Sequence, residues 1–224
     1  LRSEDGDEGY PGTVEVSVVY TAAETGDGVR VLGIEYQVEL VGDEVEETVV
    51  NVTNHSYFNL TGNPTIEGTQ VSLCTNSYLP VDDGGIPTGN PTAYAGVEAH
   101  KTFTLGAEEP DIDDCFIVDP SAASSIPLDT RTSPLTRLVT AYHPQTKIHL
   151  EVWSTEPAFQ FYTGKYIDVP AVEGQAARGK RSGFCVEPSR YVNAVNVPEW
   201  KAQVVLKKGE VYGSRVVYKG WSDE

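Results

Sequence analysis

Apolar and polar residues alternate along several short segments of the chain. Residues 13–20 read TVEVSVVY, in which Val14, Val16 and Val18 are separated by polar or outward positions. Residues 34–40 read IEYQVEL and repeat the pattern. Because successive side chains of a strand point to opposite faces, a period of two indicates a strand with one buried face. The sequence therefore predicts half-buried strands over 13–20 and 34–40.

Other segments predict strands and hairpins from β-branched content and turn residues. Residues 48–53 read TVVNVT, a β-branched run. Residues 136–142 and 147–153 flank the letters HPQT, which are typical of a hairpin loop. Residues 202–206 and 211–218 flank KKGE in the same way. We predict one hairpin at each of these two places.

The coarse pattern favours an all-β fold. No stretch of ten or more residues keeps a helical period, and many short strands separated by turns are typical of a sandwich or barrel. The segments 119–134 and 170–181 read as surface loops within one domain spanning residues 1–224. The basic end of the second loop is expected to lie in solvent: Arg178, Lys180 and Arg181.

Charge narrows the range of partners. The chain has 33 acidic and 16 basic residues, which gives a formal charge of −17. A surface this negative repels nucleic-acid phosphates and anionic lipid heads, so we expect neither nucleic acid nor a membrane as a partner. A small neutral molecule fits this charge better.

Cysteine and histidine spacing gives no support for a metal site. Cys74, Cys115 and Cys185 are far apart and form no CxxC pair, and the histidines show no HExxH spacing. We expect three thiols in a reducing compartment, with a disulfide as the alternative. The cytoplasm is therefore the expected location, and secretion is the alternative.

Four segments carry residues suited to chemistry. The segment NVTNHSYFNLTG at 51–62 gathers Asn54, His55 and Tyr57, which suit either sugar binding or a turn with a satisfied histidine. In GFCVEPSRY, Glu187 follows an apolar run and is either an ion-pair partner or a general base.

The other two segments are equally ambiguous when taken alone. Gln160 lies between two phenylalanines in AFQFYTG and needs a partner if it is buried. Asp113 belongs to DIDDCFIV, where acidic residues at a strand entry are usually solvated. Neither segment decides a function by itself.

Together and in this order, the segments resemble the galactose mutarotase (aldose 1-epimerase) family, and its fungal members above all. The resemblance covers nearly the whole chain and rests on five motifs: NHSYFNL at 54–60, LPVDDGGIPTG at 79–89, Asp113 to Phe116, QFYTG at 160–164 and GFCVEP at 183–188. It implies a large antiparallel β-sandwich, the mutarotase-like supersandwich, and an enzyme that interconverts the α and β anomers of a free monosaccharide such as galactose or glucose.

The resemblance also implies roles for individual residues. His55 corresponds to the general acid and Glu187 to the general base, while Asp113, Gln160, Asn54 and Tyr57 would bind the sugar. An imidazole titrates near neutral pH, and a carboxylate suits removal of the anomeric proton. No metal and no redox cofactor is implied.

One departure from the family pattern is large. Family members have a further N-terminal portion with substrate-binding residues that match nothing in this sequence. We expect that portion to be missing from this chain, and either a separate chain or a longer polypeptide to carry it. One such polypeptide is a fusion with a UDP-galactose 4-epimerase.

Three other functions remain open at this point. A non-catalytic carbohydrate-binding sandwich would not need both His55 and Glu187. A hexose-6-phosphate 1-epimerase would need an Arg-rich pocket, which the negative charge disfavours. A glycoside hydrolase would need two carboxylates across one bond, such as Asp113 and Glu187.

Overall fold

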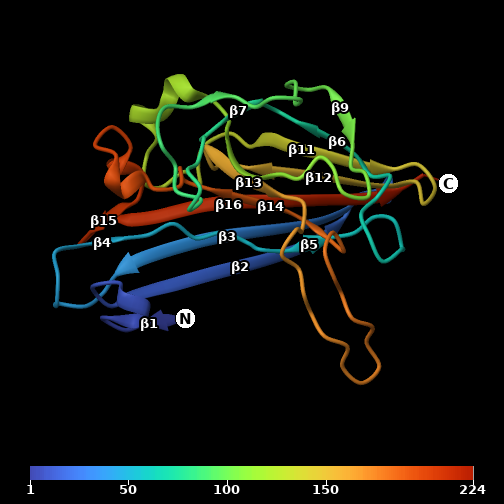
Figure 1. The fold of residues 1–224 in the computed structure, drawn as a ribbon. Coiled ribbons are helices and arrows are strands. Elements are labelled where there is room, and N and C mark those ends of the chain that lie inside the picture. The colour runs from blue at the N-terminus through green and yellow to red at the C-terminus, as the bar shows by residue number, and fades with distance from the viewer. Residues whose placement is uncertain (224) are drawn as a thin grey trace.

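The computed structural model describes residues 1–223. The all-β prediction is confirmed, since two antiparallel sheets make up most of the molecule (Figure 1). The helices assigned there are short 3-10 segments of three to six residues: η1 (Asp7–Gly9), η2 (Pro120–Ser125), η3 (Ala194–Asn196) and η4 (Lys201–Gln203). Within the same residues, no helix has the length and apolar character needed to cross a bilayer.

The larger sheet has eight strands and carries both long N-terminal strands and the C-terminal strand. Its spatial order is β1 (Arg2–Ser3), β2 (Val14–Glu24), β3 (Arg30–Leu40), β16 (Val211–Ser222), β12 (Ile148–Ser154), β11 (Thr136–His143), β6 (Gln70–Leu73) and β9 (Thr102–Thr104). Every pair in it is antiparallel, so the predicted antiparallel architecture is confirmed.

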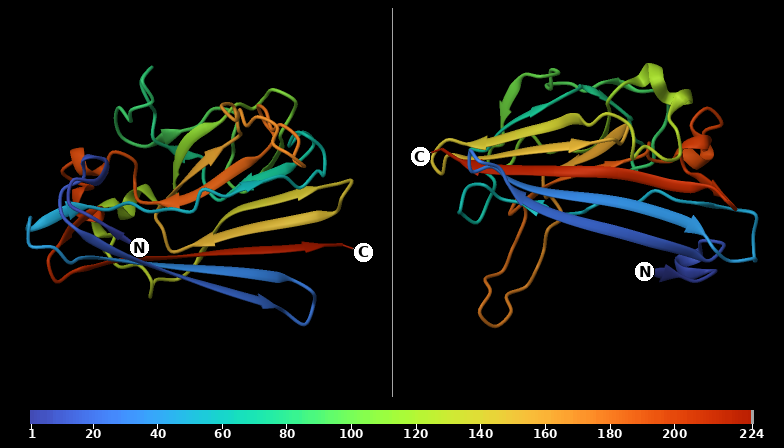
Figure 2. Two further views of the ribbon diagram at one scale, coloured as in Figure 1. Left: turned by 90° about the horizontal axis from the view of Figure 1, so that it is seen from below. Right: turned by 180° about the vertical axis from the view of Figure 1, so that it is seen from behind.

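The second sheet has six strands and lies over part of the first (Figures 1 and 2). Its order is β5 (Tyr57–Phe58), β14 (Phe184–Ser189), β13 (Ala158–Tyr162), β10 (Asp113–Ile117), β7 (Ser77–Tyr78) and β8 (Thr92–Ala93). A small two-stranded sheet joins β15 (Val205–Lys207) to β4 (Glu47–Val49).

The core forms where the two sheets face each other. Alternate residues of β13 and β14 point toward the larger sheet, and these include Phe159, Phe161 and Phe184. They share one buried cluster with Leu150 of β12 and Val216 of β16. Burial of such side chains contributes about 1.5–3 kcal/mol each, so this interface is the main source of stability.

The strands predicted over 13–20 and 34–40 are confirmed and run longer than predicted. Their residues pair in register, with Val18 opposite Tyr36 and Tyr20 opposite Ile34. The inward side chains of β3 are buried from Ile34 to Leu40, whereas Leu32 and the inward side chains of β2 toward Glu24 are exposed. The second sheet therefore does not cover the β2 half of the inner face.

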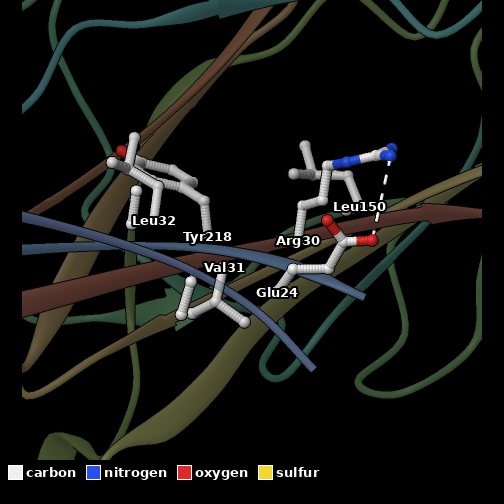
Figure 3. A pocket seen from close by; sticks show the side chains of 9 residues that line it. Glu24, Arg30, Val31, Leu32, Leu150 and Tyr218 are labelled. Atoms are coloured by element: carbon white, nitrogen blue, oxygen red, sulfur yellow. Dashed lines mark ion pairs between the residues drawn. The ribbon is translucent and has the colours of Figure 1, made fainter. Parts of the chain in front are cut away.

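This uncovered half forms an apolar groove of about 570 Å³. Figure 3 shows Leu32 and Tyr218 at one end of the groove and the Glu24–Arg30 ion pair, with atoms 4.0 Å apart, at the other. Val18 and Tyr20 continue the same face and are exposed. In a sandwich, the inner faces of the two sheets normally pack against each other. This part of the inner face is apolar and exposed, which is typical of an interaction surface.

Of the two predicted hairpins, only the first is correct. β11 and β12 form it, with His143 paired to Ile148. The prediction at 202–218 is wrong, because β15 pairs with β4 and β16 pairs with β3 and β12. The pairing of β15 with β4 places Leu206 in a buried cluster with Val38, Val50 and Tyr212.

The connection from β13 to β14 is the predicted loop at 170–181, and it projects from the body of the molecule (Figure 1). The expectation that its basic end is solvated is wrong for Arg181. That side chain is buried, and its guanidinium donates to the carbonyl oxygens of Gly106 (3.1 Å) and Pro110 (3.0 Å). Arg181 therefore anchors the base of the loop.

Candidate active site

The outer face of the six-stranded sheet is covered at one end and open at the other. At the covered end, Cys115 and Ala158 pack against Tyr191 and Trp200 from the segment that follows β14. Beyond that end, the outward residues include Asp113, Gln160 and Glu187, and the segment that carries His55 and Tyr57 lies beside them. Open polar side chains beside a packed apolar patch are typical of ligand sites.

Strand register brings the predicted residues to this open face. Gln160 of β13 lies opposite Glu187 of β14, and Cys115 of β10 lies opposite Gln160. Two residues along, Tyr162 pairs with both Asp113 and Cys185. Because alternate residues share a face, residues from three strands that are distant in sequence form one surface.

The central contact joins His55 and Glu187. His55 Nε2 lies 3.2 Å from Glu187 Oε1. The histidine side chain is 52% exposed, whereas that of Glu187 is only 13% exposed. One proton carrier therefore faces solvent and the other is largely enclosed, with a direct path between them.

His55 has two further neighbours that fix its ring. Its Nδ1 lies 3.5 Å from Cys185 Sγ, and its ring stacks on Tyr57 with centroids 5.0 Å apart. Tyr57 in turn makes an edge contact with Tyr162 at 6.4 Å. Both imidazole nitrogens thus have partners, so the ring is oriented before any ligand arrives.

Gln160 connects the acidic members of the site. Its Nε2 donates a hydrogen bond of 2.8 Å to Asp113 Oδ1, and its backbone lies opposite Glu187. The expectation that Gln160 needs a partner is confirmed. Both the amide and the carboxylate remain on the open face, where they can exchange hydrogen bonds with hydroxyl groups.

The surroundings of Glu187 raise its pKa above the usual value for a glutamate side chain. Burial is the main cause that raises its pKa, and the negative charge of Asp113 adds to the rise. The neighbouring His55 acts in the opposite direction. A carboxylate with a raised pKa is a stronger base than an ordinary one, which suits proton abstraction near neutral pH.

Asn54 lies next to His55 but points to the other side of the sheet. Its Oδ1 accepts hydrogen bonds from the backbone nitrogen of Ser56 and from the hydroxyl of Tyr218, each at 3.1 Å. The side-chain oxygen of Asn54 therefore fixes the segment that carries His55 to Tyr218. A contact between Asn54 and a sugar stays a prediction.

The end of β14 is held by a buried ion pair. Arg190 and Glu156 are both fully buried, with 3.2 Å between their charged atoms. The Tyr212 hydroxyl donates to Glu156 at 3.0 Å, and the guanidinium lies over the Tyr212 ring at 4.9 Å. This cluster, three residues beyond Glu187, fixes that strand to β16.

Sequence reasoning missed Cys185 as a member of the site. Its sequence context marks it only as one of three thiols, although it lies two residues before Glu187 and within the apolar run that precedes that residue. The period of two was the available signal, because it places Cys185 and Glu187 on the same face. What the sequence did not show is that His55 lies against both.

A pocket of about 620 Å³ adjoins the site. Tyr57 is shared between the two, and Tyr166, Asp168 and Arg178 line the far side of the pocket. The Tyr162 hydroxyl accepts a hydrogen bond of 2.6 Å from the Tyr166 backbone nitrogen, which sets the start of the projecting loop. The open face therefore continues into a space wide enough for a sugar.

Sequence comparison finds the same family that the motifs resemble. The family model described as aldose 1-epimerase matches residues 1–219. The chain is 42% identical over 219 residues to the bifunctional protein GAL10 of Pachysolen tannophilus, covering 96% of this chain and 29% of that protein. It is 34% identical over 228 residues to human galactose mutarotase, covering 97% of this chain and 60% of that protein.

Solved structures share the fold. A GalM/aldose epimerase homologue from C. elegans superposes with a TM-score of 0.80 at 20% identity, over 100% of this chain and 65% of that one. Galactose 1-epimerase from Lactobacillus acidophilus gives 0.71 at 22% identity, over 100% of this chain and 62% of that one. The chain thus spans less than two thirds of the length of these relatives. With its motifs, its sandwich and a family match over residues 1–219, the chain belongs to the aldose 1-epimerase family.

Proposed function

We propose that this chain is the catalytic part of an aldose 1-epimerase that interconverts the α and β anomers of a free aldose such as galactose or glucose. The observation that carries the proposal is the contact of 3.2 Å between His55 Nε2 and Glu187 Oε1. The family acts on sugars. An acid and a base in contact on an open polar face supply the two proton transfers that the reaction needs.

The reaction follows from those two groups. Glu187 takes the proton of the anomeric hydroxyl while His55 gives one to the ring oxygen. The bond between C1 and the ring oxygen breaks, and C1 becomes an aldehyde. After rotation about the C1–C2 bond, the hydroxyl formed from the ring oxygen attacks the other face of the aldehyde. In this closing step His55 takes the proton of that hydroxyl and Glu187 returns one to the new anomeric oxygen. No electron is gained or lost, so the step balances with these two residues alone.

Substrate binding is assigned to the polar and aromatic residues around this pair. Asp113 and Gln160 are proposed to bind hydroxyl groups, and their mutual hydrogen bond of 2.8 Å fixes them for that purpose. Tyr57 offers a half-exposed ring beside His55. Asn54 is proposed to contribute from the same segment. Holding the sugar against both proton carriers supplies most of the acceleration.

The other readings fit less well. A binding module has no use for a buried carboxylate held against an imidazole. The Arg-rich pocket that a phosphate needs is poorly supported, because two of the nearby cations are engaged and Arg178 is the cation that lines the adjoining pocket: Lys165 pairs with Asp111 at 2.7 Å, and Arg181 is buried on backbone carbonyls. A hydrolase would release reducing sugar from a glycoside, which a direct assay distinguishes from anomerisation.

The test is the polarimetric decay of freshly dissolved α-D-galactose, with and without the purified protein. We expect faster decay, and a loss of at least about 100-fold in both Glu187→Gln and His55→Ala, because general acid–base catalysis contributes about 10²–10⁴-fold. Glu173→Gln, at the exposed tip of the projecting loop, is the matched control and should keep the full rate. Normal rates in either site variant would overturn that residue's role.

We further propose that residues 1–224 form one domain whose uncovered inner face receives additional strands, either from a separate chain or from the same polypeptide. The support is the apolar groove beside Leu32, the exposed side chains of Val18 and Tyr20, and the 60% share of human galactose mutarotase that the chain spans. Covering those side chains contributes roughly 25 cal/mol per Å².

An intact-mass spectrum and a dye-binding assay test this second proposal. If residues 1–224 are isolated alone, the face should bind an apolar fluorescent dye, and Tyr20→Ser should reduce that signal. If further protein covers the face, the mass should exceed that of residues 1–224 and dye binding should be weak. Strong dye binding by the larger species would contradict the proposal.

We propose a cytoplasmic location. Cys74, Cys115 and Cys185 are free thiols. Asn51, Asn54 and Asn59 each begin an N-x-S/T sequence, the acceptor pattern for N-glycosylation in secreted proteins. Two of them have side-chain amide groups that already donate hydrogen bonds: Asn51 to Arg190 and Asn59 to Ser182. Glycosylation there would break contacts that hold the site. Mass spectrometry of the native protein tests this, since an attached glycan would contradict it.

A further inference from the structure

The site holds a cluster of three metal-ligating groups that the reaction itself does not require as ligands. His55, Cys185 and Glu187 each offer one ligand atom, and these atoms lie within 4.8 Å of one another. Thiolate, imidazole and carboxylate together form a donor set that Zn²⁺ accepts, and three protein ligands leave one position for water. Sequence spacing hides the set because His55 lies 130 residues from Cys185.

We propose that this cluster is a binding site for a thiophilic divalent cation, of which Zn²⁺ is the natural example, and that the bound ion inhibits the enzyme. The inhibition rests on the proposed function, whereas the binding does not. An ion held by both proton carriers would remove the imidazole lone pair and the carboxylate oxygen from catalysis.

The three groups lie near one another on the scale of a tetrahedral ion's ligands, with one ligand atom of each within 4.8 Å of the others. With Zn–S near 2.3 Å and Zn–N or Zn–O near 2.0–2.1 Å, tetrahedral geometry separates S from N by about 3.5 Å and N from O by about 3.4 Å. The observed contacts are 3.5 Å from Cys185 Sγ to His55 Nδ1 and 3.2 Å from His55 Nε2 to Glu187 Oε1, so they involve different nitrogens of the ring.

The histidine ring must turn to complete the site. Its two nitrogens face different partners, and one ion takes a single nitrogen, so the ring has to turn. The ring is 52% exposed, which leaves room for that rotation. Cys185 and Glu187 are two residues apart on β14 and already point to the same side. Binding displaces the thiol proton, which leaves as one proton to solvent for each ion bound.

The choice of cation follows from the donors. Mg²⁺ and Ca²⁺ prefer sites made wholly of oxygen ligands, and this cluster offers one carboxylate, one nitrogen and one sulfur. We therefore expect Zn²⁺ and Co²⁺ to bind and millimolar Mg²⁺ to have no effect.

The first test is a Co²⁺ titration of the reduced protein, read by ultraviolet absorption. A thiolate-to-cobalt charge-transfer band should appear and saturate at one ion per chain, and Zn²⁺ should abolish it by displacement. Cys185→Ser should remove the band, and His55→Ala should weaken Co²⁺ binding at least about 100-fold, because loss of a direct ligand costs no less than loss of an outer partner.

Cys74→Ser is the matched control, because Cys74 is a half-buried free thiol outside the cluster. It should keep the band. A band that survives Cys185→Ser, or disappears in Cys74→Ser, would overturn the proposal, as would the absence of any band. Circular dichroism of each variant shows whether the fold is retained, and His55→Ala decides the question if Cys185→Ser does not fold.

The second test measures inhibition. Zn²⁺ should slow anomerisation of galactose in the wild-type protein and in Cys74→Ser, and EDTA should restore the rate. In Cys185→Ser, the same Zn²⁺ concentration should inhibit far less relative to that variant's own rate. Cobalt binding without inhibition would overturn the regulatory half of the proposal, and an absence of basal activity would bear on the proposed function alone.

Discussion

Asn51 and Arg190 hold each other through two reciprocal hydrogen bonds. The Arg190 backbone nitrogen donates to Asn51 Oδ1 at 2.9 Å, and Asn51 Nδ2 donates to the Arg190 carbonyl oxygen at 3.3 Å. Asn51 lies four residues before His55, and Arg190 lies three residues after Glu187. The pair therefore joins the segment of the acid to the strand of the base, 139 residues apart in sequence.

Asn51→Ala should loosen the geometry of the site without removing any reacting group. We expect kcat to fall by about 10- to 100-fold, because small displacements of reacting groups carry costs of that order. Asn51→Asp keeps the oxygen that accepts from the Arg190 backbone nitrogen but loses the amide that donates to the Arg190 carbonyl. Its kcat should therefore lie between those of the wild-type protein and Asn51→Ala. Polarimetric kinetics measure the effect, and Asn63→Ala, an exposed asparagine, serves as the control. An unchanged kcat in Asn51→Ala would show that the pair does not position the site.

Asp113→Asn should move the acid limb of the pH profile to lower pH. Burial and the charge of Asp113 both raise the pKa of Glu187, so removing that charge lowers it. The limb of kcat/KM reports the base in the free enzyme. In the wild-type protein it should lie above the ordinary glutamate value of about 4.3. Asp83→Asn, on an exposed turn, should leave the profile in place.

Gln160→Glu should move the same limb in the opposite direction. The substitution keeps the size of the side chain but places a second negative charge beside Asp113 and opposite Glu187. The pKa of Glu187 then rises further, so less of the base is ionised at a given pH. The profile of kcat/KM against pH measures the shift, and an unmoved limb would argue against Glu187 as the base.

Glu156→Ala should destabilise the fold more than most surface changes. It leaves the guanidinium of Arg190 buried and unpaired, which costs about 3–5 kcal/mol in the free energy of unfolding. Urea unfolding measures this. Glu98→Ala breaks an exposed pair with Lys101, so its effect should stay within about 1 kcal/mol. Equal effects in the two variants would contradict the structural role of the buried pair.

The sequence by itself determined the class of fold and most of the candidate site. Alternation over 13–20 and 34–40 predicted β2 and β3 because a strand with one buried face needs that period. His55, Glu187, Asp113 and Gln160 could be named because their motifs resemble those of the aldose 1-epimerase family, whereas each segment alone left structural and functional interpretations open.

Only the tertiary structure decided which distant residues meet. Strand β15 pairs with β4 rather than with β16, and its Leu206 is buried in a cluster with Val38 and Val50, which lie far away in the sequence. Arg181 is buried because the backbone carbonyls of Gly106 and Pro110 lie where its guanidinium can reach them. Cys185 joins His55 through contacts across 130 residues, and local spacing carries no information about such distances.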